Sequence, residues 1–362
     1  MSRSLDELRQ GIDAVDDQIV RLLDERATHV KEVGRLKSEL NLPFYVPDRE
    51  RNILERLTRA HQQSGGAFPE AALRPVFSEI ISACLSLEQS LKVAFLGPEA
   101  TFTHMAARSR FGLSARYLPA ATIAGVFTEV EKKLAHIGVV PIENSTEGVV
   151  NSTLDVFIDS DLTISAEIIL SVSQNLLTRS GTLDGIQKVY SHPQALGQCQ
   201  KWLSANLPKA APIEVASTAL AARLAKDDPS SAAVASALAG QLYELKVARA
   251  KIEDEVDNVT RFLVIGMHPT QPTGSDKTSI MFSVKDQPGV LARVLQQLSD
   301  KKLNLTRIES RPSRRRAWDY LFFIDLDGHA DEPNVKAALS ALERDCELVK
   351  VLGSYPRAEK IE

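Results

Sequence analysis

The chain has 362 residues, 25% of them charged, and a formal net charge of −4 at pH 7. This length predicts two or three domains, and the near-balanced charge gives no general electrostatic reason to bind nucleic acid. The N-terminus enters an amphipathic pattern without the apolar core of a signal peptide, and no segment approaches the roughly 18 uncharged apolar residues of a membrane span. Three scattered cysteines, Cys84, Cys199 and Cys346, match neither a disulfide framework nor a metal site. We therefore expect a cytoplasmic protein without metal.

Residues 5–40 place apolar side chains at steps of three and four, which predicts one long helix of roughly 50 Å. A breaker ends at Pro47, a residue well suited to begin a helix, so we expect a second helix to about Gln63 and a third from Glu70 to about Ser90. A helix this long cannot bury its apolar stripe against two shorter ones. The all-α segment 1–90 thus predicts a homodimer, or a higher homo-oligomer, that shares its long helices.

Three cations on the long helix, Arg9, Arg26 and Lys37, are the first candidates for chemistry. Arg26 and Lys37 are eleven residues apart, which returns to nearly the same helix face, whereas Arg9 points about a quarter turn away. Spacing alone favours an ordinary solvated surface over a site for these three cations.

Residues 91–267 predict an α/β domain large enough for two lobes. It begins with an apolar strand at 92–96 and continues as short strands alternating with helices. Four polar clusters, at 97–103, 141–148, 191–194 and 258–262, lie at the ends of predicted strands, where open α/β folds place ligands. Each cluster alone could equally cap a helix or form a turn.

The remainder predicts a linker and a small α+β domain. Residues 266–277 are rich in turn formers, and 278–357 follow in the βαββαβ order of a ferredoxin-like fold. The basic run 311–316 (RPSRRR) lies between two predicted strands, so we interpret it as a solvated hairpin.

Four N-glycosylation patterns begin at Asn144, Asn151, Asn258 and Asn304. In a cytoplasm they would go unused. We interpret the first and third as polar groups placed for chemistry, Asn151-Ser152-Thr153 as structural, and Asn304 as part of the small domain.

The order of residues in the helical segment resembles the all-helical chorismate mutases. L-R at 8–9, D-E-R at 24–26, V-G-R-L-K at 33–37 and P-D-R-E-R at 47–51 carry the resemblance, which covers residues 5–90. It implies an intertwined helical dimer that catalyses a pericyclic rearrangement without a cofactor, by holding the compact substrate conformer and stabilising charge on the breaking ether oxygen. Arg26, Arg49 and Arg9 of the partner subunit would hold carboxylates. Lys37 would face the ether oxygen and Glu50 the substrate hydroxyl.

Three positions depart from the pattern of some chorismate mutases. Val46 replaces Asp, Cys84, a further substrate-binding candidate, replaces Ser, and Glu88, a catalytic candidate, replaces Gln. A carboxyl group can donate a hydrogen bond to the ether oxygen only when it is protonated. We therefore expect mutase activity to fall as pH rises, and a Glu88→Gln variant to have a flatter profile.

In their order, the four polar clusters resemble prephenate dehydratase across residues 92–267. V-P-I-E-N-S-x-x-G-x-V, S-H-P-Q-A-L and N-x-T-R-F are all present, and Ala100 stands where the usual G-P-x-G-T-F has Gly. The resemblance implies a two-lobed fold like that of the periplasmic binding proteins, with the active site between the lobes. The substrate-binding candidates are Thr101, Thr103, Glu143, Asn144, Ser145, Ser191, His192, Gln194, Asn258, Arg261 and Phe262.

That resemblance also assigns roles in a reaction that expels carbon dioxide and hydroxide as the ring becomes aromatic. Thr260 would donate to the departing hydroxyl, Arg261 would hold a carboxylate and Phe262 would pack against the substrate. Because a threonine hydroxyl is a poor acid, a relay to Glu143 or His192 is expected, and the sequence does not choose between them.

D-Q-P-G-V-L-A at 286–292 and I-E-S-R-P at 308–312 resemble the two signature segments of the ACT regulatory domain, covering 278–357. Gly289-Val-Leu-Ala replaces the commoner G-A-L-V order. The family binds phenylalanine between paired ACT domains, and a helix N-terminus at Gly289 offers backbone donors to a carboxylate, although a plain dimerisation module is an alternative. The regulatory candidates are Gly289, Val290, Leu291, Asn304, Glu309, Ser310 and Arg311.

Together these segments predict a multidomain enzyme with domains at 1–90, 91–267 and 278–357. It would convert chorismate through prephenate to phenylpyruvate, with feedback inhibition by L-phenylalanine. A non-catalytic amino-acid sensor built on a helical dimer is the alternative. The cation order within residues 9–49 separates the two, because a mere dimerisation helix has no use for it.

Overall fold

The computed structural model describes residues 4–40, 42, 45, 47–255, 258–284, 287–312, 320–358 and 360–361. They form two compact units. The first contains the residues up to Lys92 together with Arg108–Arg116, and the second contains Val93–Ala107 and the residues from Tyr117 onward. Val46, Asp286 and most of the basic run, from residue 313, lie outside the described residues. Within the described part, no helix has both the length and the apolar character needed to span a membrane.

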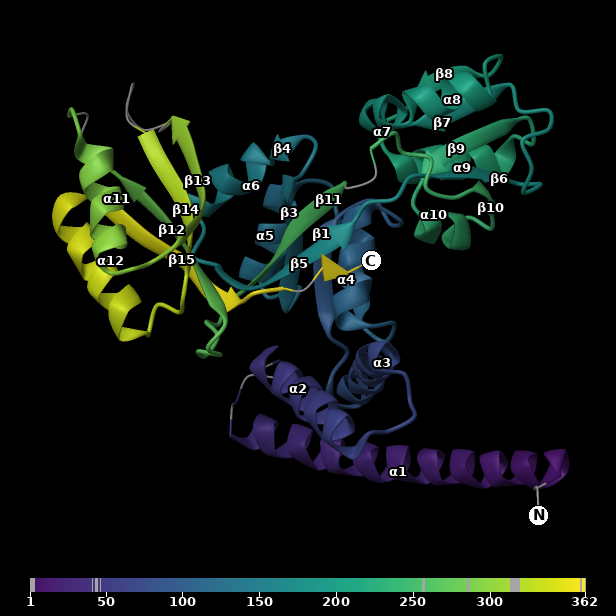
Figure 1. Cartoon of the computed structure of the whole chain (residues 1–362), viewed down its shortest axis with the longest axis horizontal. Helices are drawn as coiled ribbons and strands as arrows, with labels where there is room; N and C mark the ends of the chain where they lie inside the picture. Colours follow the sequence, from purple (N-terminus) through teal and green to yellow (C-terminus); the bar gives the residue numbers. More distant parts are fainter. Residues whose placement is uncertain are drawn as a thin grey trace. The chain divides into compact units, whose positions relative to one another are not determined.

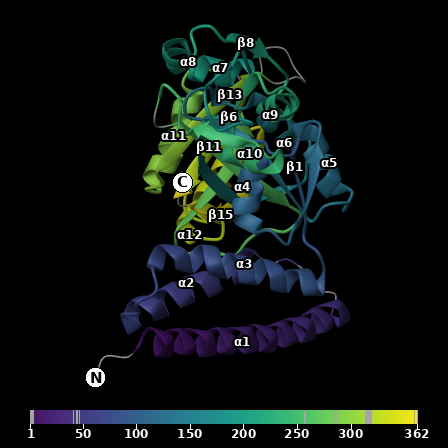
Figure 2. The same ribbon diagram turned by 90° about the vertical axis from the view of Figure 1, so that its right-hand side faces the viewer.

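The first unit confirms the predicted long helix and its two shorter neighbours: α1 (Leu5–Glu39), α2 (Pro47–Ser64) and α3 (Glu70–Glu88). Ser4 and Glu7 form a capping box that fixes the start of α1. Figures 1 and 2 show the three helices lying against one another. No residue of α1 is buried, and its apolar side chains are exposed at Leu5, Leu8, Ile12, Val15, Ile19, Val20, Leu22, Val33 and Leu36.

The second unit begins with an α/β lobe around a seven-stranded sheet, ordered β16-β5-β11-β3-β1-β2 with β4 paired to β3. Strand β11 comes from the end of the domain and runs antiparallel to both β3 and β5. The chain therefore leaves this lobe and returns to it. Its elements are β1 (Lys92–Leu96), α4 (Phe102–Phe111), β2 (Arg116–Ala120), α5 (Ile123–Glu131), β3 (Ile137–Asn144), β4 (Gly148–Val149), α6 (Asn151–Phe157), β5 (Thr163–Ser171), β11 (Val259–Gly266) and β16 (Lys360–Ile361).

The second lobe is inserted between β5 and β11 and has its own five-stranded sheet, ordered β10-β6-β9-β7-β8. Alanines of α9 pack on this sheet without exposure to solvent, which lets the helix lie close to the strands. The elements are β6 (Asn175–Thr178), β7 (Lys188–Ser191), α7 (Pro193–Gln198), α8 (Gln200–Asn206), β8 (Ala211–Glu214), α9 (Thr218–Asp227), β9 (Ser231–Ala235), α10 (Ala237–Leu242) and β10 (Lys246–Arg249). The expected two-lobed α/β architecture is confirmed.

The C-terminal part of the second unit confirms the βαββαβ order. Its four-stranded antiparallel sheet has the order β13-β14-β12-β15, and Figure 1 shows α11 and α12 together on one face of it. The elements are β12 (Asp276–Ser283), α11 (Val290–Asp300), β13 (Leu305–Pro312), β14 (Tyr320–Asp327), α12 (Pro333–Asp345) and β15 (Leu348–Pro356).

The two faces of this small sheet belong to different cores. Ile280, Phe282 and Ile324 pack with α11 and α12. Met281 and Phe323, which alternate with them along the strands, join the main core of the first α/β lobe. The small domain therefore shares buried apolar surface with the domain that precedes it.

Candidate functional sites

The first candidate site lies on the helical unit, where Lys37 of α1 faces Glu88 of α3. Lys37 Nζ is 3.3 Å from Glu88 Oε2, and the Glu88 side chain is only 6% exposed. Gly34 makes this approach possible, because a Cβ at that position would lie 2.7 Å from Glu88 Cγ. The V-G-R-L-K segment thus contains both the small residue that lets α3 approach α1 and the lysine that pairs with Glu88.

Arg26 lies three helical turns before Lys37 on nearly the same face of α1. Its Nη1 atom is buried and has no hydrogen-bond partner among the described residues, an arrangement suited to an anionic ligand. Arg9 is exposed and pairs with Asp6 in the first turn. At 1.5 Å per residue, Arg9 is about 25 Å along the helix from Arg26, so both can serve one site only if Arg9 comes from another copy of the chain.

Glu50 has a partner that the sequence did not reveal. Its Oε1 accepts an ion pair from Arg110 Nη1 at 2.9 Å, and Tyr45 donates to its other oxygen at 3.4 Å. Burial alone lowers the pKa of Arg110, but the charge of Glu50 raises it above its ordinary value. Arg49 is exposed and Cys84 is buried.

The second candidate site centres on three polar side chains that two separate motifs bring together. The register pairs Thr260 of β11 with Asn144 of β3. Asn144 Nδ2 donates to Thr260 Oγ1 at 2.8 Å and to Asn258 Oδ1 at 2.7 Å. The side-chain oxygen Oδ1 of Asn144 accepts from the backbone N–H groups of Thr146 and Glu147, each at 3.0 Å. These bonds fix which end of the amide faces the threonine.

Because Asn144 donates to the Thr260 oxygen, the hydroxyl proton of Thr260 is not used in that bond. It remains available to another acceptor. Thr260 is 8% exposed and Asn258 is 4% exposed, so both lie in a sheltered place. Ser145 secures the turn, since its hydroxyl accepts from Val259 N at 2.9 Å.

A glutamine that the motifs did not indicate connects this cluster to the second lobe. Asn258 Nδ2 donates to Gln198 Oε1 at 3.2 Å, and Gln174 Nε2 donates to the same oxygen at 3.2 Å. Gln198 is the last residue of α7, which begins at the proline of the S-H-P-Q motif. Its position four residues after Gln194 on a helix is the sequence signal that could have found it.

In the first polar cluster, Ala100 stands where the family pattern has glycine. Ala100 has φ of 68°, a left-handed conformation that strains a residue with a Cβ. Ser236 of the second lobe donates to its carbonyl at 3.0 Å. Thr101 caps α4, because its hydroxyl accepts from His104 N at 3.3 Å, and Thr103 is buried in the first turn.

The S-H-P-Q cluster occupies the second lobe. The Ser191 hydroxyl is fully buried and donates to Val234 O at 2.6 Å, which makes it a link between two strands. His192 caps α7, where its Nδ1 accepts from Gln194 N at 3.4 Å. Gln194 is exposed, whereas Phe262 of β11 is buried. Within the described residues, His192 and Thr260 are not hydrogen-bonded to each other.

Arg261 does not have the surroundings expected of a carboxylate holder. Successive residues of a strand point to opposite faces, so Arg261 points away from the face that carries Thr260. Its three guanidinium nitrogens donate to Glu167 at 2.8 Å, Asp325 at 2.6 Å and Tyr355 at 2.9 Å. One N–H of each guanidinium nitrogen is thus bonded within the protein, which favours a structural contact over substrate binding.

Glu143 shares that opposite face. It pairs with Arg261 in the strand register, and its carboxylate lies 3.5 Å from Arg307 Nε and 3.9 Å from Arg261 Nη1. Of the two relay partners left open for Thr260, Glu143 is disfavoured because the sheet separates it from the threonine hydroxyl.

The charged groups behind the sheet stabilise one another electrostatically. Burial alone raises the pKa of Asp325, but the charge of Arg261 and a hydrogen bond from Ser279 lower it overall. Burial and the charge of Asp325 raise the pKa of Tyr355. Burial alone lowers the pKa of Arg261, yet the surrounding acidic groups raise it. Asp325 and Arg261 are therefore both charged at neutral pH.

The regulatory candidates occupy two places in the small domain. Gly289 has φ of 77° and precedes α11 without a side-chain cap, and Val290 and Leu291 pack against the core under that helix. Glu309, Ser310 and Arg311 lie on the edge strand β13. Asn304 donates to Asp327 at 3.1 Å. Arg311 is not solvated as expected, because it makes a two-pronged ion pair with Asp155 of α6.

Comparison with known proteins gives three matches in chain order. The family model for chorismate mutase type II matches residues 8–89, prephenate dehydratase matches 93–270, and the ACT domain matches 278–344. Fold and sites therefore define a three-domain enzyme of the chorismate mutase and prephenate dehydratase classes.

Full-length relatives combine the same domains. A bifunctional chorismate mutase/prephenate dehydratase from Aquifex aeolicus is 52% identical over 98% of both chains, and one from Pseudomonas aeruginosa is 43% identical over 97% of both. A crystal structure of prephenate dehydratase from Arthrobacter aurescens in complex with L-Phe is 35% identical with a TM-score of 0.69, covering 74% of this chain and 90% of that chain. The chain belongs to the bifunctional chorismate mutase/prephenate dehydratase family.

Proposed function

We propose that the chain converts chorismate to prephenate and prephenate to phenylpyruvate, and that L-phenylalanine inhibits the second step. The observation that carries the proposal is that one chain contains two separate polar constellations, Arg26 with Lys37 and Glu88, and Asn144 with Asn258 and Thr260. A non-catalytic sensor would need neither. The substrates and the effector are small molecules, and the family relationship supports both activities.

In the mutase site, the residues would bind and orient the substrate and take no part in covalent chemistry. The buried Nη1 atom of Arg26, which has no hydrogen-bond partner among the described residues, offers a donor for a carboxylate. Lys37 would face the ether oxygen, where negative charge develops as the C–O bond breaks. Glu88 would share that position, and the tight packing at Gly34 holds it beside Lys37.

In the dehydratase site, Thr260 would donate its proton to the hydroxyl group that leaves the ring. The C–C bond to the departing carboxylate breaks, its electron pair enters the ring, and the C–O bond breaks to give water after protonation. The hydrogen bond that Asn144 donates to the Thr260 oxygen supports this role, because it directs the hydroxyl proton away from Asn144. His192 stays the candidate for resupplying the proton.

The proposed regulatory site comprises the start of α11 and the residues of β13. Among the described residues, the edge position of β13 in the four-stranded sheet leaves one side of the strand without a neighbouring strand, as pairing of two ACT domains would require. The α11 start at Gly289 would supply backbone donors to the phenylalanine carboxylate. Coupling of this kind is reciprocal, so a prephenate analogue should weaken phenylalanine binding.

We also propose that the protein is a homodimer or a larger homo-oligomer built on α1. The exposed apolar stripe of α1 and the distance of about 25 Å between Arg9 and Arg26 both support a shared helical core. The proposed domains are 1–90, 91–267 and 278–357, and the proposed location is the cytoplasm. We propose no cofactor for either reaction.

A single assay tests both activities: chorismate is supplied, and prephenate and phenylpyruvate are followed with and without phenylalanine. Arg26→Ala should stop prephenate formation but leave turnover of added prephenate unchanged. Thr260→Ala should do the reverse. Matched controls are Arg35→Ala, an exposed arginine of the same helix, and Thr163→Ala, whose hydroxyl donates to the backbone carbonyls of Gly266 and His268.

Dehydration at the wild-type rate by Thr260→Ala would remove Thr260 from the mechanism. Calorimetry that detects no phenylalanine binding would reject the regulatory role of the small domain, without affecting the two catalytic assignments.

A further inference from the structure

Strands β3 and β11 present different chemistry on their two faces at neighbouring positions. Thr260 pairs with Asn144, and the next pair in the register is Arg261 with Glu143. Since side chains alternate across a strand, the first pair faces the dehydratase site and the second pair faces the small regulatory domain. On each strand, the members of the two pairs are consecutive residues.

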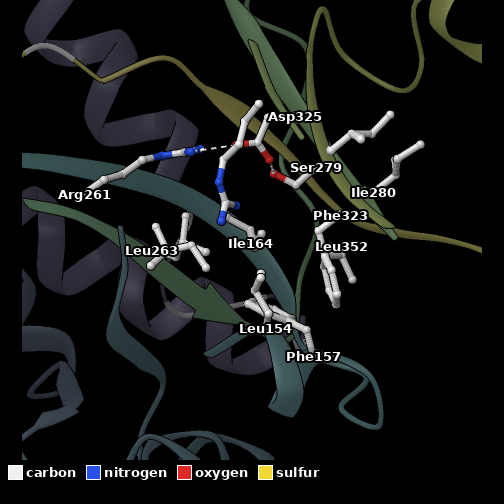
Figure 3. Close-up of a pocket in the computed structure, with 13 residues that line it drawn as sticks. Leu154, Phe157, Ile164, Arg261, Leu263, Ser279, Ile280, Phe323, Asp325 and Leu352 are labelled. Carbon is white, nitrogen blue, oxygen red and sulfur yellow. Dashed lines mark hydrogen bonds and ion pairs between the residues drawn. The ribbon is translucent and has the colours of Figure 1, made fainter. Parts of the chain in front are cut away.

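The regulatory domain contacts both members of the second pair. Arg261 donates to Asp325 of β14 at 2.6 Å and to Tyr355 of β15 at 2.9 Å. Arg307 of β13 lies 3.5 Å from Glu143. Figure 3 shows Arg261 extended toward Asp325, with Ser279 bonded to the same carboxylate. Three of the four strands of the small sheet therefore contact the two residues that lie directly behind Asn144 and Thr260.

These contacts are held in a densely packed, buried place. Asp325 is 3% exposed and Tyr355 is fully buried. Ser279 bonds to both of them, at 2.5 Å and 2.6 Å. The cavity among these groups is about 10 Å³, the room that one water molecule needs. Because close-packed interiors transmit displacement and do not absorb it, a shift of the small sheet must move Arg261.

We propose that Arg261 is a positioning residue for the dehydratase reaction, which sets the placement of Thr260 according to the position of the regulatory sheet. This proposal rests on the dehydratase function proposed above. Arg261 has no contact with the substrate in this role. It connects Asp325 and Tyr355 to the strand that carries the proton donor, and Glu143 with Arg307 acts in the same way on the strand that carries Asn144.

A purely structural role would give a different result, because a contact that only fastens the two domains would be interchangeable with any other. Lys350 of β15 provides the comparison. Its ammonium group donates to Phe157 O at 3.0 Å and Ser160 O at 2.7 Å, which fastens the same sheet to the same lobe at the end of α6. Neither acceptor adjoins Asn144 or Thr260 in the sequence or in the strand register.

The test compares Asp325→Asn, Ser279→Ala and Lys350→Met in the full-length protein. Each variant is assayed for kcat and KM with prephenate, for the phenylalanine concentration that halves the rate, for mutase rate and for thermal unfolding. Wild type in the same prephenate assay tests the proposed function itself. Absence of dehydratase activity there overturns that function, whereas an active wild type makes the variants a test of Arg261 alone.

We expect Asp325→Asn to lower dehydratase kcat by about tenfold or more with a smaller change in KM, because an interaction made in the transition state acts on kcat. The half-inhibiting phenylalanine concentration should change by at least about fivefold, the lower range of allosteric coupling. Ser279→Ala should shift both quantities in the same direction but less. Lys350→Met should leave both within about twofold of wild type, and mutase rates should be unchanged.

Two results would overturn the proposal. One is a kcat and a phenylalanine response in both Asp325→Asn and Ser279→Ala that match wild type. The other is an equal change in Lys350→Met, which would mean that any loss of contact between the domains has this effect. If Asp325→Asn does not fold, the comparison of Ser279→Ala with Lys350→Met decides by the same criteria.

Discussion

Replacing Gly34 by alanine tests how helix packing positions the mutase residues. The added Cβ would lie 2.7 Å from Glu88 Cγ and 3.1 Å from Glu88 Cβ. Carbon atoms in good contact are about 3.5–4.0 Å apart, so Glu88 must move by about 1 Å.

Two opposing effects determine the stability of Gly34→Ala. Alanine in a helix interior is about 0.8–1.0 kcal/mol more favourable than glycine, whereas overpacking a tight contact costs about 1–3 kcal/mol. The net change is therefore a loss of about 0–2 kcal/mol. Activity is the more sensitive measure, because a misplacement of about 1 Å can lower a rate by about 10²-fold.

The assay measures chorismate turnover, prephenate turnover and thermal unfolding of the same preparation. We expect a mutase rate reduced by about 10- to 100-fold with an unchanged dehydratase rate. Ser38→Ala is the control, since this exposed residue of the same helix gains helix propensity without adding an atom beside Glu88. A Gly34→Ala protein with the mutase rate of wild type would refute the view that Glu88 must stay in place beside Lys37.

Three further predictions concern the second unit. Ala100→Gly should keep dehydratase activity and change stability by less than about 1 kcal/mol, because relief of left-handed strain is offset by chain entropy and a lost buried methyl; a larger loss in urea denaturation would contradict this balance. The lowered pKa of Asp325 means that its ion pair stabilises the fold above about pH 4 and that this stabilisation is lost as pH falls below that value. In calorimetric unfolding, acidification should lower the stability of Asp325→Asn less than that of wild type. Burial raises the pKa of Cys199 to about 12 and of Cys346 to about 11, so alkylation by iodoacetamide at pH 8 should be slower than for a free thiol by on the order of 1000-fold and 100-fold, respectively. Rapid labelling of either of these two cysteines in the native protein would be inconsistent with these values.

Periodicity and motif order predicted most of the architecture. The helices of the first unit follow from apolar residues spaced three to four apart, and the strands of the small domain from apolar residues spaced two apart. These elements end within a few residues of the predicted positions. The short strands of the second lobe were not predicted one by one. Strands of four residues such as β6 and β8 contain too few side chains to establish a period.

The candidate sites were predicted where a motif and its strand lie together. Asn144, Asn258 and Thr260 gather as expected because one motif ends β3 and the other begins β11, its antiparallel neighbour. The partners Arg110 and Gln198 were missed, since they depend on contacts between distant segments that no local pattern encodes. Successive side chains of a strand point to opposite faces, so Thr260 and Arg261 cannot both face one ligand. This rule could have corrected the predicted role of Arg261 as a carboxylate holder.

The exposed stripe of α1 has a consequence for how the two activities respond to dilution. If Arg9 of the partner subunit completes each mutase site, that site exists only in the associated protein, and its amount follows the law of mass action. The Asn144–Thr260 pair lies within one chain and carries no such requirement. Diluting the protein below the dissociation constant of its dimer would then lower the mutase rate per chain while prephenate turnover persists, so the ratio of the two rates would report the concentration of the protein itself.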